Sequence, residues 1–145
     1  WPGATVGAKG NDGVTGVVKQ TKGAIGYVEL AYAIKNGLPT ADVKNKNGKY
    51  VAPSIKGVSA SAATLKDDVY NGDLRISIVD QVGDDVYPIS AFTYILLPVT
   101  KETTQLKEVK AFLNWALTKG QDMAGDLHYA PLPTKLTEVL LKKIK

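Results

Sequence analysis

Hydrophobic residues recur at helical spacing in the first part of the chain. One stretch can be capped by Asn11 or Asp12, carries Val14, Val17, Val18 and Thr21 on one face, and ends at Gly23. A second, residues 31–36, is followed by Gly37, a residue suited to a helix C-terminus. We therefore predict a helix after a glycine-rich loop at residues 1–13, and a shorter helix near residue 34.

Helical spacing returns after residue 52. Pro53 suits the first position of a helix whose apolar face runs to Leu65. The strongest pattern covers residues 105–119, where a wide apolar stripe precedes Gly120 as the predicted cap. A short helix is predicted at residues 121–127, and Thr134 is the predicted cap of a last helix that ends near Ile144.

Other segments have the shorter period or the continuous apolar character of strands. Residues 24–30 and 91–99 predict buried strands, and the alternation in residues 75–81 predicts a third strand. Residues 41–52 predict a hairpin that turns at residues 45–48, because an Asn-Gly pair suits positive φ. Turns are expected at 71–72 and 83–85. The result is a mixed α/β chain without the strict alternation of a complete doubly wound domain.

Composition places the chain among soluble globular proteins. Of its 145 residues, 44% are hydrophobic and 22% are charged, and cysteine is absent, which excludes thiolate metal sites and thiol catalysis. The net charge of +4 comes almost entirely from dispersed lysines, and Arg75 is the single arginine. A nucleic-acid site usually has clustered arginines beside stacking aromatics, so no nucleic-acid partner is expected.

The sequence offers no constellation for catalysis. His128 stands alone, and one histidine without cysteines makes a poor zinc site. The acidic pairs 67–68 and 84–85 are adjacent in sequence, and neighbouring side chains point apart on a helix or strand. We therefore expect no enzyme activity, no catalytic residue, no metal site and no cofactor.

The glycine-rich start leaves an anion site open as an alternative. Residues 3–9 lack the lysine spacing of a phosphate-binding Walker loop, and Gly10, Gly13 and Gly16 do not fit the dinucleotide fingerprint. What remains is a loop that leads into a helix N-terminus, where free backbone N–H groups can hold an anion. A tight loop with an ordinary cap explains the same residues.

Several segments, taken in order, carry a family resemblance. They are residues 9–14, 18–21, 23–29 and 31–33, then 87–89 with 94–96, 109–116 with Gly120, and 126–133. Together they cover nearly the whole chain and resemble the phosphate-binding proteins of phosphate-specific ABC importers. The resemblance implies the type II clamshell fold of periplasmic binding proteins, with the present chain as its C-terminal part only.

The same resemblance implies a division of the chain. Residues 1–88 would form part of the second lobe, residues 89–100 a strand that crosses the hinge, and residues 101–145 the C-terminal helices that return to the first lobe. It also implies the function: binding of inorganic phosphate outside the cytoplasm and delivery to the membrane subunits of an ABC permease. The protein would be periplasmic or extracellular, either free or anchored as a lipoprotein, and a monomer when complete.

No phosphate-binding residue can be carried onto this sequence. The family grips the anion with an Arg, a Ser-Gly-Thr loop, further hydroxyl and backbone donors, and an Asp, and these motifs do not occur here. Arg75 lies in a different sequence context. A non-transport role on the same fold, in adhesion, signalling or inhibition, is the alternative function.

Overall fold

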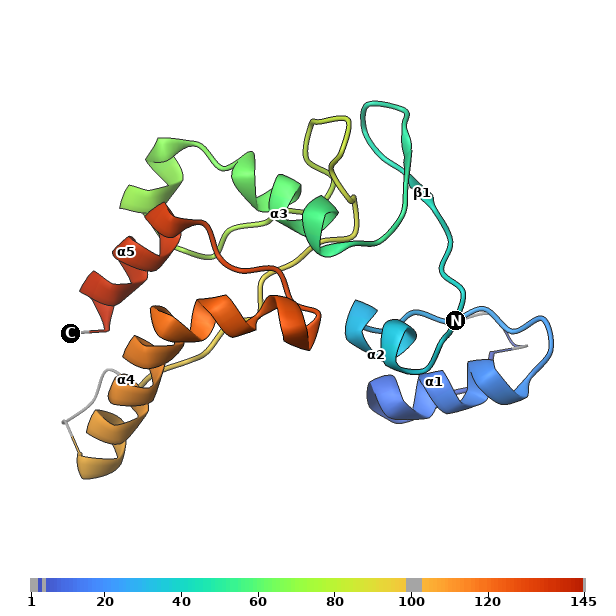
Figure 1. Ribbon diagram of the computed structural model, residues 1–145, viewed down its shortest axis with the longest axis horizontal. Helices are drawn as coiled ribbons and strands as arrows, with labels where there is room; N and C mark the ends of the chain where they lie inside the picture. Colours follow the sequence, from blue (N-terminus) through green and yellow to red (C-terminus); the bar gives the residue numbers. More distant parts are fainter. Residues whose placement is uncertain (1–2, 4, 99–102, 145) are drawn as a thin grey trace. The chain divides into compact units, whose positions relative to one another are not determined.

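The computed structural model describes Gly3, residues 5–98 and residues 103–144, and the chain divides into two compact units, Trp1–Ala41 and Asp42–Lys145 (Figure 1). Among these described residues, the helices are all too short or too polar to cross a membrane.

The first unit contains two helices, both predicted. Helix α1 spans Gly10–Gln20 and helix α2 spans Leu30–Lys35. Helix α1 takes in residues 10–13, which were expected to be loop, and its C-terminal cap is Thr21, two residues before Gly23. Gly37 follows the C-terminal cap of α2 with a φ of 63°, the left-handed conformation that glycine adopts without strain.

The prediction of a buried strand at residues 24–30 was wrong. The segment forms no strand, and the side chain of Ile25 is 98% exposed. It instead lies against α1: a Cβ on Gly26 would come within 2.7 Å of Val18 and 2.9 Å of Val14. A strand needs hydrogen bonds from a neighbouring strand. Across the described residues, strand pairing is confined to the hairpin of the second unit.

That hairpin was predicted correctly. Strands β1 (Val43–Lys44) and β2 (Tyr50–Val51) are antiparallel, with Val43 opposite Val51. Gly48 adopts a φ of 80° in the turn, and its N–H donates to the carbonyl of Asn45 at 2.8 Å. Gly48 thus supplies the positive φ that this turn needs, a conformation that glycine adopts without strain.

Helix α3 (Ile55–Ala63) begins later than predicted. Pro53 was expected at its first position, but Ser54 is the N-terminal cap and its hydroxyl accepts a hydrogen bond from the N–H of Gly57 at 3.0 Å. A serine side chain satisfies a free N–H at this position, which proline cannot do. A 3₁₀ helix, η1 (Asp67–Asn71), follows before the predicted turn at Gly72.

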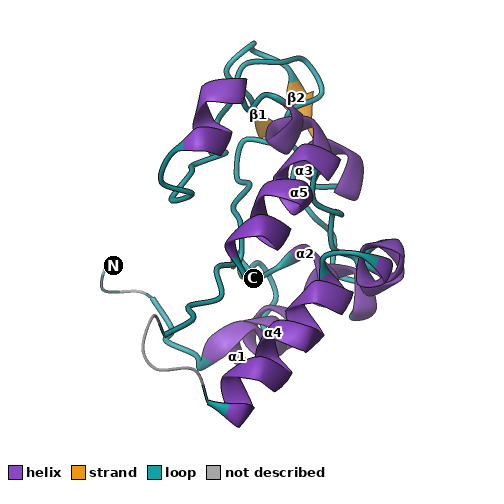
Figure 2. Cartoon of the chain, turned by 90° about the vertical axis from the view of Figure 1, so that its left-hand side faces the viewer, coloured by secondary structure: helices purple, strands orange, loops and turns teal. Residues whose placement is uncertain are grey.

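The predictions of strands at residues 75–81 and 91–99 were also wrong. Residues 73–78 and 91–98 have no regular secondary structure, and Val99 lies outside the described residues. Figure 2 shows strand only at β1 and β2 among the parts it describes. Of the apolar residues in the alternating pattern, Ile78 is buried at 1% exposed, whereas Val79 is 54% exposed.

The C-terminal part is helical, with corrections at its boundaries. Helix α4 (Thr104–Ala116) ends three residues before the predicted Lys119, and Gly120 lies inside the 3₁₀ helix η2 (Lys119–Met123) and does not cap α4. The expected short helix at residues 121–127 is formed by η2 and a second 3₁₀ turn, η3 (Gly125–Leu127). Helix α5 (Thr134–Lys143) has Thr134 as its first residue, not as its cap.

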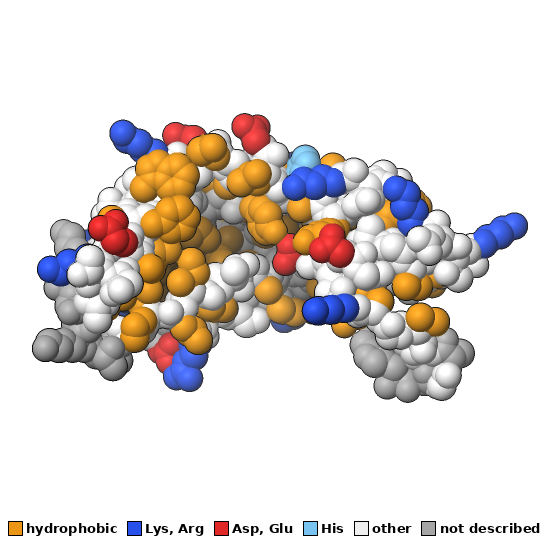
Figure 3. Space-filling view, turned by 90° about the horizontal axis from the view of Figure 1, so that it is seen from below, with side chains coloured by type: hydrophobic (Ala, Val, Ile, Leu, Met, Phe, Trp, Pro, Cys, Tyr) orange, Lys and Arg blue, Asp and Glu red, His pale blue; other side chains and the backbone are white. Residues whose placement is uncertain are grey.

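Only part of the apolar stripe on α4 is covered. Leu106 and Leu113 are buried, whereas Val109, Phe112 and Trp115 are exposed. Phe112 and Trp115 contact each other with ring centroids 5.8 Å apart. Hydrophobic side chains are visible together on the left of Figure 3, where α4 faces the viewer. Exposed apolar side chains that lie together often mark a contact with another part of a protein.

Candidate functional site

The N-terminus of α1 was the anion-site candidate of the sequence. Its cap residue, Lys9, makes no side-chain hydrogen bond to the helix, and Gly10 enters the helix with a φ of 64°. Asn11, a predicted cap, lies inside the first turn instead, where its side-chain oxygen accepts a hydrogen bond from the N–H of Glu29 at 3.0 Å. Asn11 therefore ties residues 24–30 to the start of α1, and this helix end alone does not define a ligand site.

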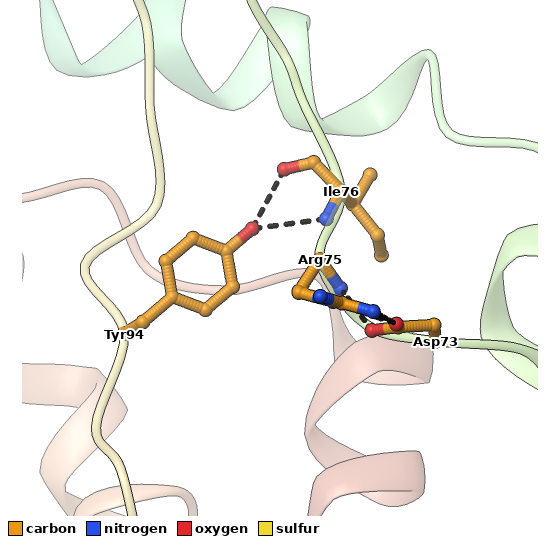
Figure 4. Close-up of polar contacts among 4 residues, drawn as sticks. All are labelled: Asp73, Arg75, Ile76 and Tyr94. Atoms are coloured by element: carbon orange, nitrogen blue, oxygen red, sulfur yellow. Dashed lines mark hydrogen bonds and ion pairs between the residues drawn. The ribbon is translucent and has the colours of Figure 1, made fainter.

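Arg75 is paired with a neighbouring carboxylate (Figure 4). Its Nε donates to Oδ2 of Asp73 at 2.7 Å, and its Nη2 donates to the same oxygen. These hydrogen bonds lower the pKa of Asp73 below its ordinary value. The Arg75 side chain is 87% exposed. Arg75 thus forms a local surface ion pair, a geometry unlike that of a residue that grips a dehydrated anion.

Tyr94 connects two segments that were predicted as strands. Its hydroxyl accepts a hydrogen bond from the N–H of Ile76 at 3.0 Å and donates one to the carbonyl of Ile76 at 2.7 Å (Figure 4). One side chain therefore occupies the backbone groups through which Ile76 would pair with a strand. Beside it lies an open depression of about 440 Å³, lined by Arg75, Ile76, Ser77, Tyr94 and Leu96.

The described carboxylates of the two acidic pairs have other partners. Asp67 forms an ion pair with Lys135, Asp84 accepts a hydrogen bond from Asn47 at 2.8 Å, and Asp85 lies 3.3 Å from Lys56. The side chain of Asp68 lies outside those that the structure describes. Within the described part of the chain, no three His, Cys, Asp or Glu side chains gather as metal ligands.

His128 occupies a structural position at the end of η3. Its backbone has a φ of 66°, and its N–H donates to the carbonyl of Gly125 at 2.9 Å. Non-glycine residues adopt this left-handed conformation rarely, and His is among those enriched in it. His128 is thus part of the turn between η3 and α5.

The most extensive buried polar network joins α3 to residues 87–90. The side chain of Ser61 is fully buried, and its hydroxyl lies 2.9 Å from the carbonyl of Gly57 and 3.0 Å from that of Tyr87. The Ser90 hydroxyl donates to the same Tyr87 carbonyl at 2.8 Å. The N–H of Tyr87 donates to the carbonyl of Gly57. A Cβ added to Gly57 would lie 3.0 Å from the Cβ of Tyr87.

Asn45 makes a second network of this kind. Its side-chain nitrogen lies 3.0, 2.9 and 3.2 Å from the carbonyl oxygens of Gly83, Asp84 and Val86, and its side-chain oxygen accepts from the N–H of Lys49 at 3.0 Å. Neither network was predicted from the sequence. The spacing of Gly57 and Ser61, small residues four apart on one helix face, is the one signal that could have indicated the close approach at α3.

Comparison with known proteins identifies the family. The model of a PBP superfamily domain matches residues 1–119. A phosphate-binding protein PstS of Xylella fastidiosa (strain Temecula1) is 41% identical over 95% of this chain and 38% of its own length. The PstS protein of Methanocaldococcus jannaschii is 38% identical over 98% of this chain and 39% of its own length. The PstS protein of Haemophilus influenzae is 36% identical over 96% of this chain and 42% of its own length.

The chain thus spans about two fifths of the length of these curated relatives. The family model covers most of the chain and includes both networks described above, those of Asn45 and Ser61. On this match, the chain belongs to the PBP superfamily.

Proposed function

We propose that this chain is part of a protein that binds inorganic phosphate outside the cytoplasm and delivers it to the membrane subunits of an ABC importer. The observation that carries the proposal is identity of 36–41% to proteins named as phosphate-binding, over 95–98% of this chain. Those names describe binding and not catalysis, and they favour phosphate binding over the alternative of adhesion, signalling or inhibition.

In the proposed architecture, the complete protein is a type II clamshell and the chain is its C-terminal part. Residues 1–88 belong to the second lobe, residues 89–100 cross the hinge, and residues 101–145 return to the first lobe. The anchoring of Tyr87 to α3 supports this division, because it fixes the chain immediately before the hinge segment. Closure of two lobes about such a segment is a common way of trapping a small ligand.

The phosphate ligands are proposed to come from other parts of the complete protein. Arg75 is paired with Asp73, and the described carboxylates among the predicted acidic pairs have cationic or amide partners. The complete protein is proposed to act as a monomer in the periplasm or outside the cell, either free or held at the membrane by a lipid anchor.

Isothermal titration calorimetry tests this proposal. The complete protein that contains this chain is expected to bind phosphate tightly and sulfate weakly, because a buried acceptor facing an unprotonated oxyanion destabilises the complex. The 145-residue chain is the matched control and is expected to bind neither anion at millimolar concentration. Equal affinity of the complete protein for the two anions would refute phosphate selectivity.

A further inference from the structure

Asparagine followed by glycine is chemically labile, because glycine leaves its own backbone nitrogen unhindered for attack on the asparagine side chain. The chain contains such pairs at residues 36–37, 47–48 and 71–72. The structure describes the side chains of Asn36 and Asn47, and it places them in different surroundings. Their comparison singles out the pair at the tip of the hairpin.

Asn47 lies exposed at the tip of the hairpin, next to the turn residue Asn45, whose buried side chain holds the start of the turn. The strands on either side are two residues long, and the pairs between them are Val43 with Val51 and Lys44 with Tyr50. At Gly48, the nearest atom to an added Cβ is the Lys44 side chain at 3.8 Å, so the turn is uncrowded. With the start of the turn held by Asn45, the exposed tip can open locally without release of the whole hairpin. Such opening releases the Gly48 N–H from its hydrogen bond to Asn45 and allows the nitrogen to approach the Asn47 side chain.

Asn36 is held more firmly. It caps the C-terminus of α2, is partly buried, and its side-chain nitrogen donates to the carbonyl of Tyr32 at 3.0 Å. The N–H of Gly37 donates to the carbonyl of Ile34 at 3.1 Å, and the N–H of Leu38 donates to the carbonyl of Ala33 at 2.9 Å. Rearrangement at Asn36 therefore requires the end of α2 to unwind, which makes attack there slower than at the hairpin tip.

We propose that Asn47 is a site of spontaneous deamidation, and that the reaction detaches the tip of the hairpin from residues 83–86. The Gly48 nitrogen attacks Cγ of Asn47 and forms a cyclic imide; the Cγ–Nδ2 bond breaks, and ammonia leaves with the proton of the Gly48 N–H. Water then opens the ring. Hydrolysis at one carbonyl gives aspartate, and hydrolysis at the other gives isoaspartate, in which the backbone runs through the former side chain.

The consequence follows from the partner of Asn47. Its side-chain nitrogen donates to Oδ1 of Asp84 at 2.8 Å. Deamidation removes this donor and replaces it with a carboxylate, so an attractive contact becomes a repulsion between like charges. The base of the hairpin stays attached, because Asn45 continues to bind the carbonyls of Gly83, Asp84 and Val86. The effect is therefore confined to the tip.

Peptide mapping by mass spectrometry tests the first part of the proposal. The protein is incubated at mildly alkaline pH, digested with a protease that does not cut at lysine, and scored for conversion of amide to acid. Asn47 is expected to convert several-fold faster than Asn36 in the folded protein, and the difference is expected to disappear in urea. Conversion of Asn36 at an equal or higher rate in the folded protein would overturn the proposal.

Hydrogen exchange tests the second part, with the backbone amide of Gly48 as the reporter of the tip and that of Asn45 as the reference for the attached base. Asn47→Asp is expected to speed exchange at Gly48 more than Asn47→Ser, which removes the donor without adding charge. The double variant Asn47→Asp/Asp84→Asn exchanges the two groups and is expected to restore slow exchange. Equal effects of the Asp and Ser variants, or no recovery in the double variant, would show that charge repulsion does not detach the tip.

Discussion

Asn45 is expected to be the most sensitive polar residue of the hairpin. Its side chain is 5% exposed and contacts the carbonyls of three residues in the 83–86 segment, while its oxygen accepts from Lys49. An amide nitrogen carries two protons, so at most two of the three carbonyl contacts are full hydrogen bonds at one time. Asn45→Ala therefore removes about three hydrogen bonds, at about 1 kcal/mol each.

The expected loss in unfolding free energy is about 2–4 kcal/mol, with the upper end reached if the Val86 carbonyl, which lies in a buried contact, is left without a partner. Asn47→Ala is the matched control in the same hairpin, and because Asn47 is exposed its effect is expected to stay within about 0.5 kcal/mol. Urea unfolding followed by circular dichroism measures both. A loss for Asn45→Ala no larger than that of the control would refute the reasoning.

Asn45→Asp separates the loss of donors from the loss of size. The variant keeps the shape of the side chain but directs an oxygen of a carboxylate at three carbonyl oxygens, which raises the pKa of the new acid. An acid whose pKa is raised on folding is stabilising when protonated, so the variant is expected to lose stability as the pH rises above the ordinary Asp pKa of about 3.9. A stability difference from the parent that does not change with pH would contradict this account.

Three further outcomes are expected. Thr103→Ala removes the hydroxyl that accepts from Leu106 at 3.2 Å and should lower the stability of α4 by about 1 kcal/mol, as measured by helical circular dichroism on heating. Ser61→Val should destabilise by about 1–3 kcal/mol in urea, since it adds volume at a fully buried position, whereas Ser61→Ala should cost about 1 kcal/mol or less. Because Arg75 lowers the pKa of Asp73, Arg75→Gln should return that pKa toward 3.8 in an NMR titration. The ion pair stabilises the folded protein at a pH above 3.8, and this stabilisation is lost as the pH falls through the lowered pKa of Asp73.

The helices and the hairpin could be predicted because their hydrogen bonds are local. Gly48 provides the positive φ of the turn through its own conformational preference, and the apolar spacing of α4 follows from helix geometry. Boundaries were less accurate where several caps competed, as at Pro53 and Ser54. There the serine hydroxyl satisfies the Gly57 N–H, an interaction that the apolar pattern does not contain.

The polar networks could not be predicted, because they join residues distant in sequence. The hydroxyl of Ser61 meets the carbonyl of a residue 26 positions away, and Asn45 reaches a residue 41 positions away. Before the fold is known, a serine on a helix and an asparagine before a turn look like ordinary surface residues. For the candidate site, the sequence context predicts that Arg75 is not a phosphate ligand, but its pairing with Asp73 became visible only in the fold.

The segments at residues 24–30 and 91–98 show why strand predictions failed where helix predictions succeeded. Both are apolar and β-rich, yet Ile25 is 98% exposed and Leu96 is 92% exposed. Burying a side chain of this size is worth about 1.5–3 kcal/mol, so both segments leave substantial stabilisation unused in this arrangement. A helix satisfies its backbone internally, whereas a strand requires a neighbour. Under the proposed clamshell, neighbours from the rest of the complete protein would cover these segments, and the cleft would depend on the same contacts.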